Sequence, residues 1–156
     1  TNYKNSITDE LTGVFNRRHY RAMVGEYVQK GVQFSVAEID CDDLKYVNDS
    51  FGHSTGDDYL QTVVNVIKGK MLPSEVLCRI GGDEFVMLSI ERTKEEMLAM
   101  LKSVNKFLCE MQLKYPASIS FGAEYIESVD FEAYRKGIHS ADKQLYSMKK
   151  TKHTER

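Results

Sequence analysis

Apolar residues follow two kinds of spacing along this chain of 156 residues. Spacings of three and four residues place side chains on one helix face. They predict helices over residues 17–30, 54–71, 93–111 and 131–149, and a shorter helix within 43–51. Runs rich in β-branched and aromatic residues predict strands over residues 32–39, 76–80, 85–90 and 117–123. Residues 1–15 are expected to be irregular, with a turn at 9–13.

Several residues mark the ends and faces of these elements. Gly31 fits the position after a helix end, and Thr93 with Glu96 forms a capping box. Ser54 with Asp57 forms an imperfect capping box for the helix that follows. Gly122 inside a strand indicates a bend or bulge. The helix over 93–111 is expected to bury one face, which consists of Met97, Met100, Leu101, Val104, Leu108 and Met111.

The arrangement of the elements predicts the fold class. The strand over 32–39 has apolar residues on both alternating faces, which is typical of a central strand covered on both sides. The two strands around Gly81-Gly82 read as a β-hairpin, because glycines supply the positive φ angles of tight two-residue turns. We therefore expect an α/β sandwich in which the hairpin shares a sheet with a strand flanked by helices.

Composition limits the class of protein. A hydrophobic content of 42% and a charged content of 28% describe one ordinary globular domain over residues 1–156, and a net charge of −2 gives no case for nucleic-acid binding or for contact with a membrane surface. The chain has no apolar run long enough for a membrane span and no signal peptide. Because it begins without Met, we expect a domain excised from a longer signalling protein.

The cysteines indicate the compartment. Cys41, Cys78 and Cys109 are far apart, odd in number and without zinc-site spacing, so a reducing cytoplasm fits best. Cys78 alternates with apolar neighbours and is expected to be a small core residue.

Acidic residues occur at two places that the sheet could bring together. Asp40 and Asp42 follow the strand over 32–39, and Asp83 and Glu84 follow Gly81-Gly82. If the two strands are neighbours, these carboxylates converge. Two unit charges about 4 Å apart repel by about 4 kcal/mol near a protein surface, so such a cluster calls for a cation. Oxygen ligands without His or Cys point to Mg²⁺. Separately solvated surface acids are the alternative.

Four further residues surround this expected site. Lys45 offers a point charge to phosphate. Asn48 and Asp57 together suit a purine edge, since guanine presents donors that a carboxylate accepts. Each also has an ordinary explanation: Asn48 at a helix end, Asp57 as a capping residue, and His53 as a loop residue that bonds the backbone.

Five ordered motifs resemble the GGDEF family of diguanylate cyclases, and the resemblance covers essentially the whole chain. The motifs are Asp9-Glu10-Leu11-Thr12-Gly13 through Arg18, the block from Asp40 to Asp57, Arg79-Ile80-Gly81-Gly82-Asp83-Glu84-Phe85, Ser118-Ile119-Ser120-Phe121-Gly122, and Ala141-Asp142 with Leu145-Tyr146 and Lys149. The family implies a central, mostly antiparallel five-stranded sheet surrounded by helices, as in the palm of nucleotidyl cyclases and polymerases.

The resemblance also implies an activity. Two GTP molecules, one per subunit of a two-fold homodimer, condense to cyclic di-GMP and two pyrophosphates with Mg²⁺ or Mn²⁺ as cofactor. The isolated domain is expected to be largely monomeric and weakly active, with control supplied by a missing N-terminal region whose signal the sequence does not identify.

Roles carry over residue by residue from the family. Asp40, the backbone carbonyl of Cys41, Asp83 and Glu84 match metal ligands, and Asp83 with Glu84 matches the catalytic acids, with Asp83 assisting deprotonation of the 3′-hydroxyl. The substrate contacts match Lys45, Asn48, His53, Asp57, Gly81, Gly82 and Lys149, in which Asn48 and Asp57 read guanine and the glycines let the backbone approach the phosphates.

Three departures from the family pattern bear on function. Leu44 replaces a common Phe at a packing position, and His153 stands where an Arg phosphate contact is expected. The segment 72–75 lacks both residues of the Arg-x-x-Asp product-inhibition site, so no feedback inhibition through that site is expected. A GTP-binding regulatory domain without catalysis is one alternative. A cyclase that makes a mixed purine dinucleotide is another, but Asp57 argues for guanine.

Overall fold

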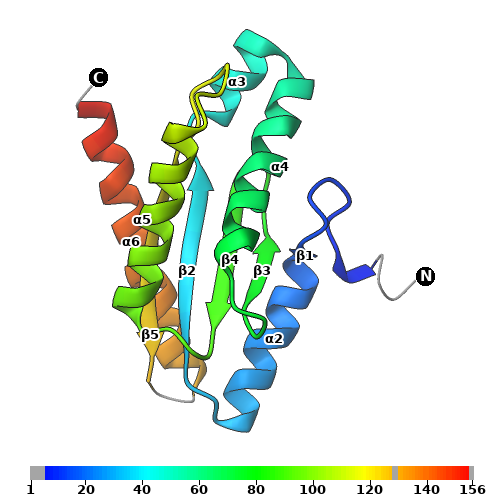
Figure 1. Ribbon diagram of the computed structural model, residues 1–156. Coiled ribbons are helices and arrows are strands. Elements are labelled where there is room, and N and C mark those ends of the chain that lie inside the picture. Colours follow the sequence, from blue (N-terminus) through cyan, green and yellow to red (C-terminus); the bar gives the residue numbers. More distant parts are fainter. Residues whose placement is uncertain (1–5, 128–129, 155–156) are drawn as a thin grey trace.

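The computed structural model describes residues 6–127 and 130–154. Within the described residues, ten elements with assigned bounds follow one another (Figure 1). They are β1 (Phe15–Asn16), α2 (Arg17–Lys30), β2 (Phe34–Cys41), α3 (Leu44–Phe51), α4 (His53–Lys70), β3 (Val76–Arg79), β4 (Glu84–Ser89), α5 (Lys94–Glu110), β5 (Ile119–Ile126) and α6 (Phe131–Thr154).

The strands form one five-stranded sheet in the order β1-β3-β4-β2-β5. The short β1 pairs in parallel with β3, and every other neighbouring pair is antiparallel. The prediction of a mostly antiparallel five-stranded sheet surrounded by helices is therefore confirmed. The expected adjacency of the hairpin and the acid-bearing strand is confirmed as well, because β4 lies directly beside β2.

Helices cover both faces of the sheet. One apolar core joins α4 and α5 to one face through residues such as Val63, Leu101 and Ile39. A second core joins α2 and α6 to the opposite face through residues such as Val24 and Val36. Alternate residues of β2 enter opposite cores, which is why its sequence is apolar on both alternations.

Three predicted helix ends can be compared with the structure. Gly31 closes α2 in the left-handed conformation with φ of 68°, and Thr93 with Glu96 forms the complete capping box of α5, as predicted. The capping box predicted at Ser54 is wrong. Helix α4 begins one residue earlier, at His53, with Gly52 (φ of 95°) as both the last cap of α3 and the first cap of α4. A single glycine makes the turn between the two helices.

The hairpin differs from the predicted tight turn. Four residues, 80–83, connect β3 to β4, and neither Gly81 nor Gly82 is among the glycines with positive φ. The loop is closed instead by bonds from the amides of Ile80 and Gly81 to the carbonyl of Glu84 (2.9 and 3.3 Å). The wider loop has room for Asp83 to reach across to the neighbouring strand β2.

Other boundaries moved for identifiable reasons. Strand β2 continues to Cys41, two residues beyond the predicted end, because it pairs with β4 and β5 up to that point. Gly122 makes no bulge: the register with β2 is continuous, and a Cβ at this position would lie 2.0 Å from the carbonyl oxygen of Ala141. This glycine therefore permits the close approach of α6 to the sheet.

The N-terminal region and one side chain also depart from expectation. The described part of residues 1–15 includes helical residues 6–7, an isolated bridge between Thr8 and Phe15, and the start of β1, so the region is not simply irregular. The turn at 9–13 is confirmed by a bond from the Gly13 amide to the Asp9 carbonyl (2.8 Å). Met111 is exposed rather than buried, because α5 ends at Glu110. Residues 1–5 lie outside the described chain.

Candidate functional site

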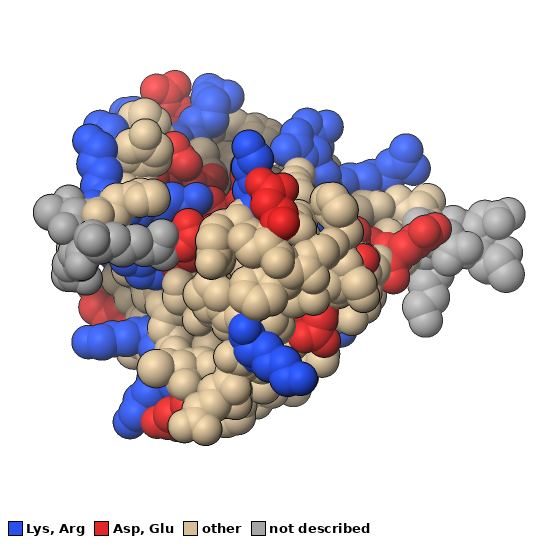
Figure 2. Space-filling model, turned by 90° about the horizontal axis from the view of Figure 1, so that it is seen from above, with Lys and Arg blue, Asp and Glu red and all other residues tan. Residues whose placement is uncertain are grey.

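The two predicted acid groups meet at one end of the sheet. Asp40 lies opposite Glu84 in the β2–β4 register, and the next amide, that of Cys41, donates to the carbonyl of Asp83 (2.9 Å). Asp40 is buried, whereas Glu84 is exposed at the start of β4. This end of the molecule also carries α3, and Figure 2 looks onto it, with acidic and basic side chains next to one another. The sheet thus brings together residues 43 positions apart in sequence.

Two arginines hold the hairpin loop by its carbonyl groups. Arg79 donates to the carbonyls of Gly81 (3.2 Å) and Gly82 (2.7 Å), and Arg17 donates to the carbonyl of Ile80 (3.0 Å). The guanidinium of Arg79 also pairs with Asp9, 3.3 Å away. Partial burial alone would raise the pKa of Asp9, but hydrogen bonds from Thr12, together with Arg79, lower it below its ordinary value. The turn at 9–13 therefore helps to hold the loop that carries Asp83.

Asp40 is the most unusual carboxylate of the site. Its Oδ2 pairs with the ammonium of Lys149, whereas Oδ1 is buried and has no hydrogen-bond partner among the described residues. Burial raises the pKa of Asp40 to about 7; the bond from Lys149 opposes this rise, and Asp83 adds to it. Burial alone would lower the pKa of Lys149, but the bond and charge of Asp40 raise it above its ordinary value. Asp40 therefore has one oxygen in an ion pair and one buried oxygen without a hydrogen-bond partner among the described residues.

A second pair of carboxyl groups lies beside Asp40, and the sequence analysis missed it. Glu38 and Asp142 line the same cavity of about 240 Å³ as Asp40, Glu84 and Lys149. Burial, together with a hydrogen bond to Asp142 and the charges around it, raises the pKa of Glu38 to about 8. The shift predicts that Glu38 keeps its proton near neutral pH, hydrogen-bonded to Asp142. The available signal was an acidic residue in the middle of an otherwise buried strand.

Asp42 has hydrogen-bond partners of its own. Its carboxylate accepts bonds from the hydroxyls of Ser118 (2.5 Å) and Ser120 (2.7 Å) and from the ammonium of Lys152 (2.6 Å). The fully buried Tyr59 hydroxyl lies 2.8 Å from the Asp42 carbonyl and 2.7 Å from that of Ser118. With both carboxylate oxygens and the carbonyl engaged, Asp42 anchors the end of β2. Its charge, with those of Asp40 and Asp83, still raises the pKa of Lys149, so its convergence with the other acids stays a prediction.

The predicted base-reading residues lie on α3 and α4. A Cβ placed on Gly56 would lie 1.7 Å from Oδ1 of Asn48, so the Asn48 side chain lies directly against the start of α4, next to Asp57. Asp57 and His53 are exposed at the start of α4, and Lys45 is exposed on α3. The structure therefore brings Asn48 and the Asp57 segment together, and Gly56 is a residue that the sequence analysis missed.

Basic groups from α6 face the turn between β2 and α3. Lys149, Lys152 and His153 line a small polar cavity of about 50 Å³ together with Asp42 and Asp43. Asp43 has a φ of 58° and makes no side-chain cap for α3, so its backbone turns the chain sharply here. Lys149 lines both this cavity and the acidic one.

The residues present fit a metal ion that is completed by its substrate. The described residues hold no group of three or more His, Cys, Asp or Glu side chains arranged around a metal position. Mg²⁺ commonly uses one or two carboxylates and takes its other ligands from water and substrate phosphates. Asp40 and Asp83, with the unpartnered Oδ1 of Asp40, satisfy that requirement.

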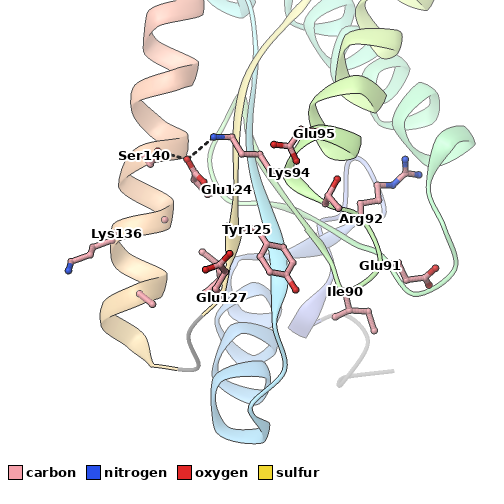
Figure 3. A pocket seen from close by; sticks show the side chains of 14 residues that line it. Ile90, Glu91, Arg92, Lys94, Glu95, Glu124, Tyr125, Glu127, Lys136 and Ser140 are labelled. Carbon is pink, nitrogen blue, oxygen red and sulfur yellow. Dashed lines mark hydrogen bonds and ion pairs between the residues drawn. The ribbon is translucent and has the colours of Figure 1, made fainter.

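A larger hollow lies at the opposite end of the sheet and contains none of the predicted site residues. This cavity of about 860 Å³ lies between α5, α6 and the end of β5 (Figure 3). Its central acid, Glu124, is already bonded to Lys94 (3.0 Å) and Ser140 (2.7 Å). A satisfied carboxylate in an open hollow gives no chemical reason to place the active site there.

Residues 6–155 match the family model "Diguanylate cyclase, GGDEF domain". The chain belongs to the GGDEF family. Among similar proteins, it is 30% identical over 155 residues to the probable diguanylate cyclase DgcT of Escherichia coli, covering 92% of this chain and 33% of DgcT. It is also 30% identical over 127 residues to the cyclic di-GMP phosphodiesterase PdeB of Shewanella oneidensis, covering 78% of this chain and 15% of PdeB.

The fold is that of solved GGDEF structures. The coiled coil and GGDEF domain of DgcB from Caulobacter crescentus, in complex with c-di-GMP, superposes with a TM-score of 0.83 at 24% identity, covering 96% of this chain and 83% of that one. The predicted family and fold class are therefore confirmed. This GGDEF domain spans a third or less of the two curated relatives described above, so the activity of a whole protein is not carried over from them.

The Glu38–Asp142 pair makes the stability of the GGDEF domain depend on pH. The pKa of Glu38 is about 8 in the folded metal-free domain and near its ordinary value of 4.5 when unfolded. The folded state therefore holds an extra proton between these values, and the free energy of unfolding falls as pH rises from 5 to 8. Allowing for partial exposure, we expect Glu38→Gln to remove about 2 kcal/mol of that fall.

Urea unfolding at several pH values, with chelator present, measures this effect. Glu10→Gln, which changes an exposed acid in the 9–13 turn, is the matched control and should follow the wild-type pH profile. An unchanged pH profile for Glu38→Gln would show that the two carboxyl groups do not share a proton.

Proposed function

We propose that this domain is a diguanylate cyclase that condenses two GTP molecules into cyclic di-GMP and two pyrophosphates. The observation that carries the proposal is the junction of β2 with the hairpin loop. There the Cys41 amide bonds to the Asp83 carbonyl, next to Asp40 with its unpartnered Oδ1. The end of α4 that carries Asp57 lies close by, against Asn48. The carboxylates proposed to act at the reacting phosphate, and the polar side chains proposed to bind guanine, thus belong to the same end of one domain.

In the proposed reaction each GTP is both nucleophile and electrophile. The 3′-oxygen of one GTP forms a bond to the α-phosphorus of the other, and the bond from that phosphorus to the bridging oxygen of the β-phosphate breaks. The proton of the 3′-hydroxyl passes to Asp83 or to water, and pyrophosphate carries away the electron pair. Repeating the step in the other direction closes the ring. Two subunits, each holding one GTP, must face each other.

The site residues divide the work of binding and orientation. Asp40, Asp83, Glu84 and the carbonyl of Cys41 hold Mg²⁺ or Mn²⁺, which when bound neutralises the α-phosphate oxygens and the charge that develops on them. Lys45 and Lys149 bind phosphate oxygens, and Gly81 and Gly82 leave the backbone open to them; a Cβ on Gly82 would meet no atom within 4 Å. Asn48 and Asp57 select guanine, with His53 as a further contact.

Product inhibition through residues 72–75 is not part of the proposed function. Leu72 has no charge for a phosphate, and Glu75 is buried with its carboxylate bonded to the Leu72 amide (2.7 Å) and to Arg92 (2.7 Å).

No helix in the described chain is long and apolar enough to cross a membrane. We propose a cytoplasmic location, where GTP and reduced cysteines are found, and no nucleic-acid partner.

A GTP-binding regulatory module is the second candidate function. His153 favours it, because a histidine lacks the planar, bidentate guanidinium with which an arginine binds a phosphate at the same place. All the carboxylates and the base-reading pair are nevertheless present, which favours catalysis.

Forced dimerisation tests the proposal. The domain fused to a two-stranded parallel coiled coil, supplied with GTP and Mg²⁺, is expected to form cyclic di-GMP and pyrophosphate in a ratio of one to two, measured by mass spectrometry. ATP should give no product, and added cyclic di-GMP should slow the initial rate only where it competes with GTP. A folded dimer that binds GTP without forming product would favour the regulatory module instead.

A further inference from the structure

Lys149 lines two neighbouring cavities. One contains Asp40, Glu38, Glu84 and Asp142, and the smaller one contains Asp42, Asp43, Lys152 and His153. The ammonium of Lys149 is bonded to Oδ2 of Asp40. Its side chain is 31% exposed, whereas that of Asp40 is 11% exposed. A partly exposed cation therefore covers a nearly buried carboxylate.

The acidic side needs this charge when no metal is bound. Carboxylates about 4 Å apart repel by about 4 kcal/mol per pair at a near-surface dielectric. The other basic groups nearby have partners of their own: Arg79 bonds Asp9 and the hairpin carbonyls, and Lys152 bonds Asp42 and the carbonyl of Ile119. Within the described chain, Lys149 is the cation paired with Asp40.

A divalent metal ion on Asp40 would repel this ammonium. A divalent ion about 4 Å from an ammonium is repelled by about 8 kcal/mol at the same dielectric, far more than the one or two kcal/mol of conformational entropy in a lysine side chain. The lysine would therefore leave when metal binds. The small cavity holds Lys152 and His153 beside Asp42 and Asp43, and Asp42 is already paired with Lys152, so a bound phosphate would give the displaced ammonium a further anionic partner.

We propose that Lys149 is a built-in counterion of Asp40 that is exchanged for metal and nucleotide together. The inference rests on the proposed function, since it takes Asp40 as a metal ligand. A metal ion that binds without nucleotide has to displace the lysine, and the ammonium gains no phosphate partner in exchange for Asp40. The affinity for metal alone is therefore low. A nucleotide triphosphate accepts the displaced ammonium, so metal and nucleotide bind with positive coupling. Free metal ions then do not hold the site in a loaded state.

Opposite changes in two affinities provide the test. Lys149→Met should bind Mn²⁺ alone about tenfold more tightly than wild type, because the competing cation is gone. The same variant should bind Mn²⁺ with a non-hydrolysable GTP analogue more weakly, because a phosphate contact is gone. Water-proton relaxation measures the first affinity and calorimetry the second. Lys150→Met, one residue further along α6, is the matched control for net charge and should change neither.

Each outcome decides the inference independently of turnover. A lysine that only binds phosphate would leave the Mn²⁺ affinity unchanged, and one that only supports the fold would weaken both affinities; either result would overturn the proposal. Formation of cyclic di-GMP by the wild type is measured separately, so failure of the cyclase proposal is not confused with failure of this one.

A measurement on the wild-type domain covers the case in which Lys149→Met does not fold. Acetylation with a water-soluble succinimidyl ester, read by peptide mass spectrometry, reports how free each lysine is. Saturating Mn²⁺ should increase the rate at Lys149 several-fold and leave the rate at Lys150 unchanged. Equal protection of Lys149 with and without Mn²⁺ would contradict the exchange.

Discussion

Replacing Asp83 by alanine is expected to lower the rate of cyclic di-GMP formation in the forced dimer by at least about a thousandfold. In the proposed mechanism the change removes both a metal carboxylate and the group that assists loss of the 3′-hydroxyl proton, and general-base catalysis alone is commonly worth about 10² to 10⁴ in rate. The fold should survive, because Asp83 contributes its backbone carbonyl to the bond with the Cys41 amide, and the substitution keeps that bond. Product formation is followed by mass spectrometry and folding by circular dichroism.

Asp83→Glu is the matched control for this prediction. It keeps a carboxylate on the hairpin loop and adds one methylene group, so we expect a measurable rate well above that of the alanine variant. The four-residue loop, held through Arg79 and Arg17, has room for the longer side chain, since Gly82 beside it has no neighbour within 4 Å of a Cβ position. A folded alanine variant with the wild-type rate would contradict the role assigned to Asp83.

The largest expected effect on stability comes from Glu75. Its side chain is completely buried, and its carboxylate accepts bonds from the Leu72 amide and from Arg92, both at 2.7 Å. Arg92 in turn donates to the carbonyl of Lys70 (2.8 Å), which joins the end of α4 to the region before α5. Glu75→Ala leaves the Leu72 amide without its partner and the Arg92 guanidinium without its counterion, and should cost about 3–5 kcal/mol of unfolding free energy.

Chemical denaturation measures that cost, and a nearby acid provides the comparison. Glu91 is exposed, and within the described residues its carboxylate accepts a hydrogen bond from the hydroxyl of Ser74. Glu91→Ala should therefore lower the unfolding free energy by less than about 1 kcal/mol. The double change Glu75→Leu with Arg92→Met should recover much of the loss, because apolar groups replace the buried pair. A loss below 1 kcal/mol for Glu75→Ala would show that the pair is not important for stability.

The sequence was sufficient to identify the elements and most of the candidate site. Periodicity located α2 with both of its ends, and the capping box of α5 was visible in Thr93 and Glu96. These features depend on residues within one or two helical turns of each other, so local spacing contains the information. The motif residues Asp40, Asn48, Asp57 and Asp83 were likewise recognisable, because each motif is short and ordered along the chain.

Boundaries that depend on neighbouring strands were less accurate. The two extra residues of β2 exist because β4 and β5 pair with them, and the hairpin opened into a four-residue loop because its carbonyls are bound by Arg79 and by Arg17 from another element. Gly122 was read as a bulge, but it accommodates α6. Apart from Arg79, which directly precedes the loop that it holds, the deciding contacts come from distant parts of the chain.

The amino-acid sequence by itself determined which chemical groups are available: the acids, the guanine-reading pair, the glycines of the hairpin and the lysines of α6. The tertiary structure decided their partners. It gave Asp42 three side-chain partners, two serines and Lys152. It left Asp40 with one buried oxygen that has no hydrogen-bond partner among the described residues. It also placed Glu38 against Asp142, and Lys149 on Asp40. Charge and burial depend on what packs across the sheet, and linear spacing does not specify that packing.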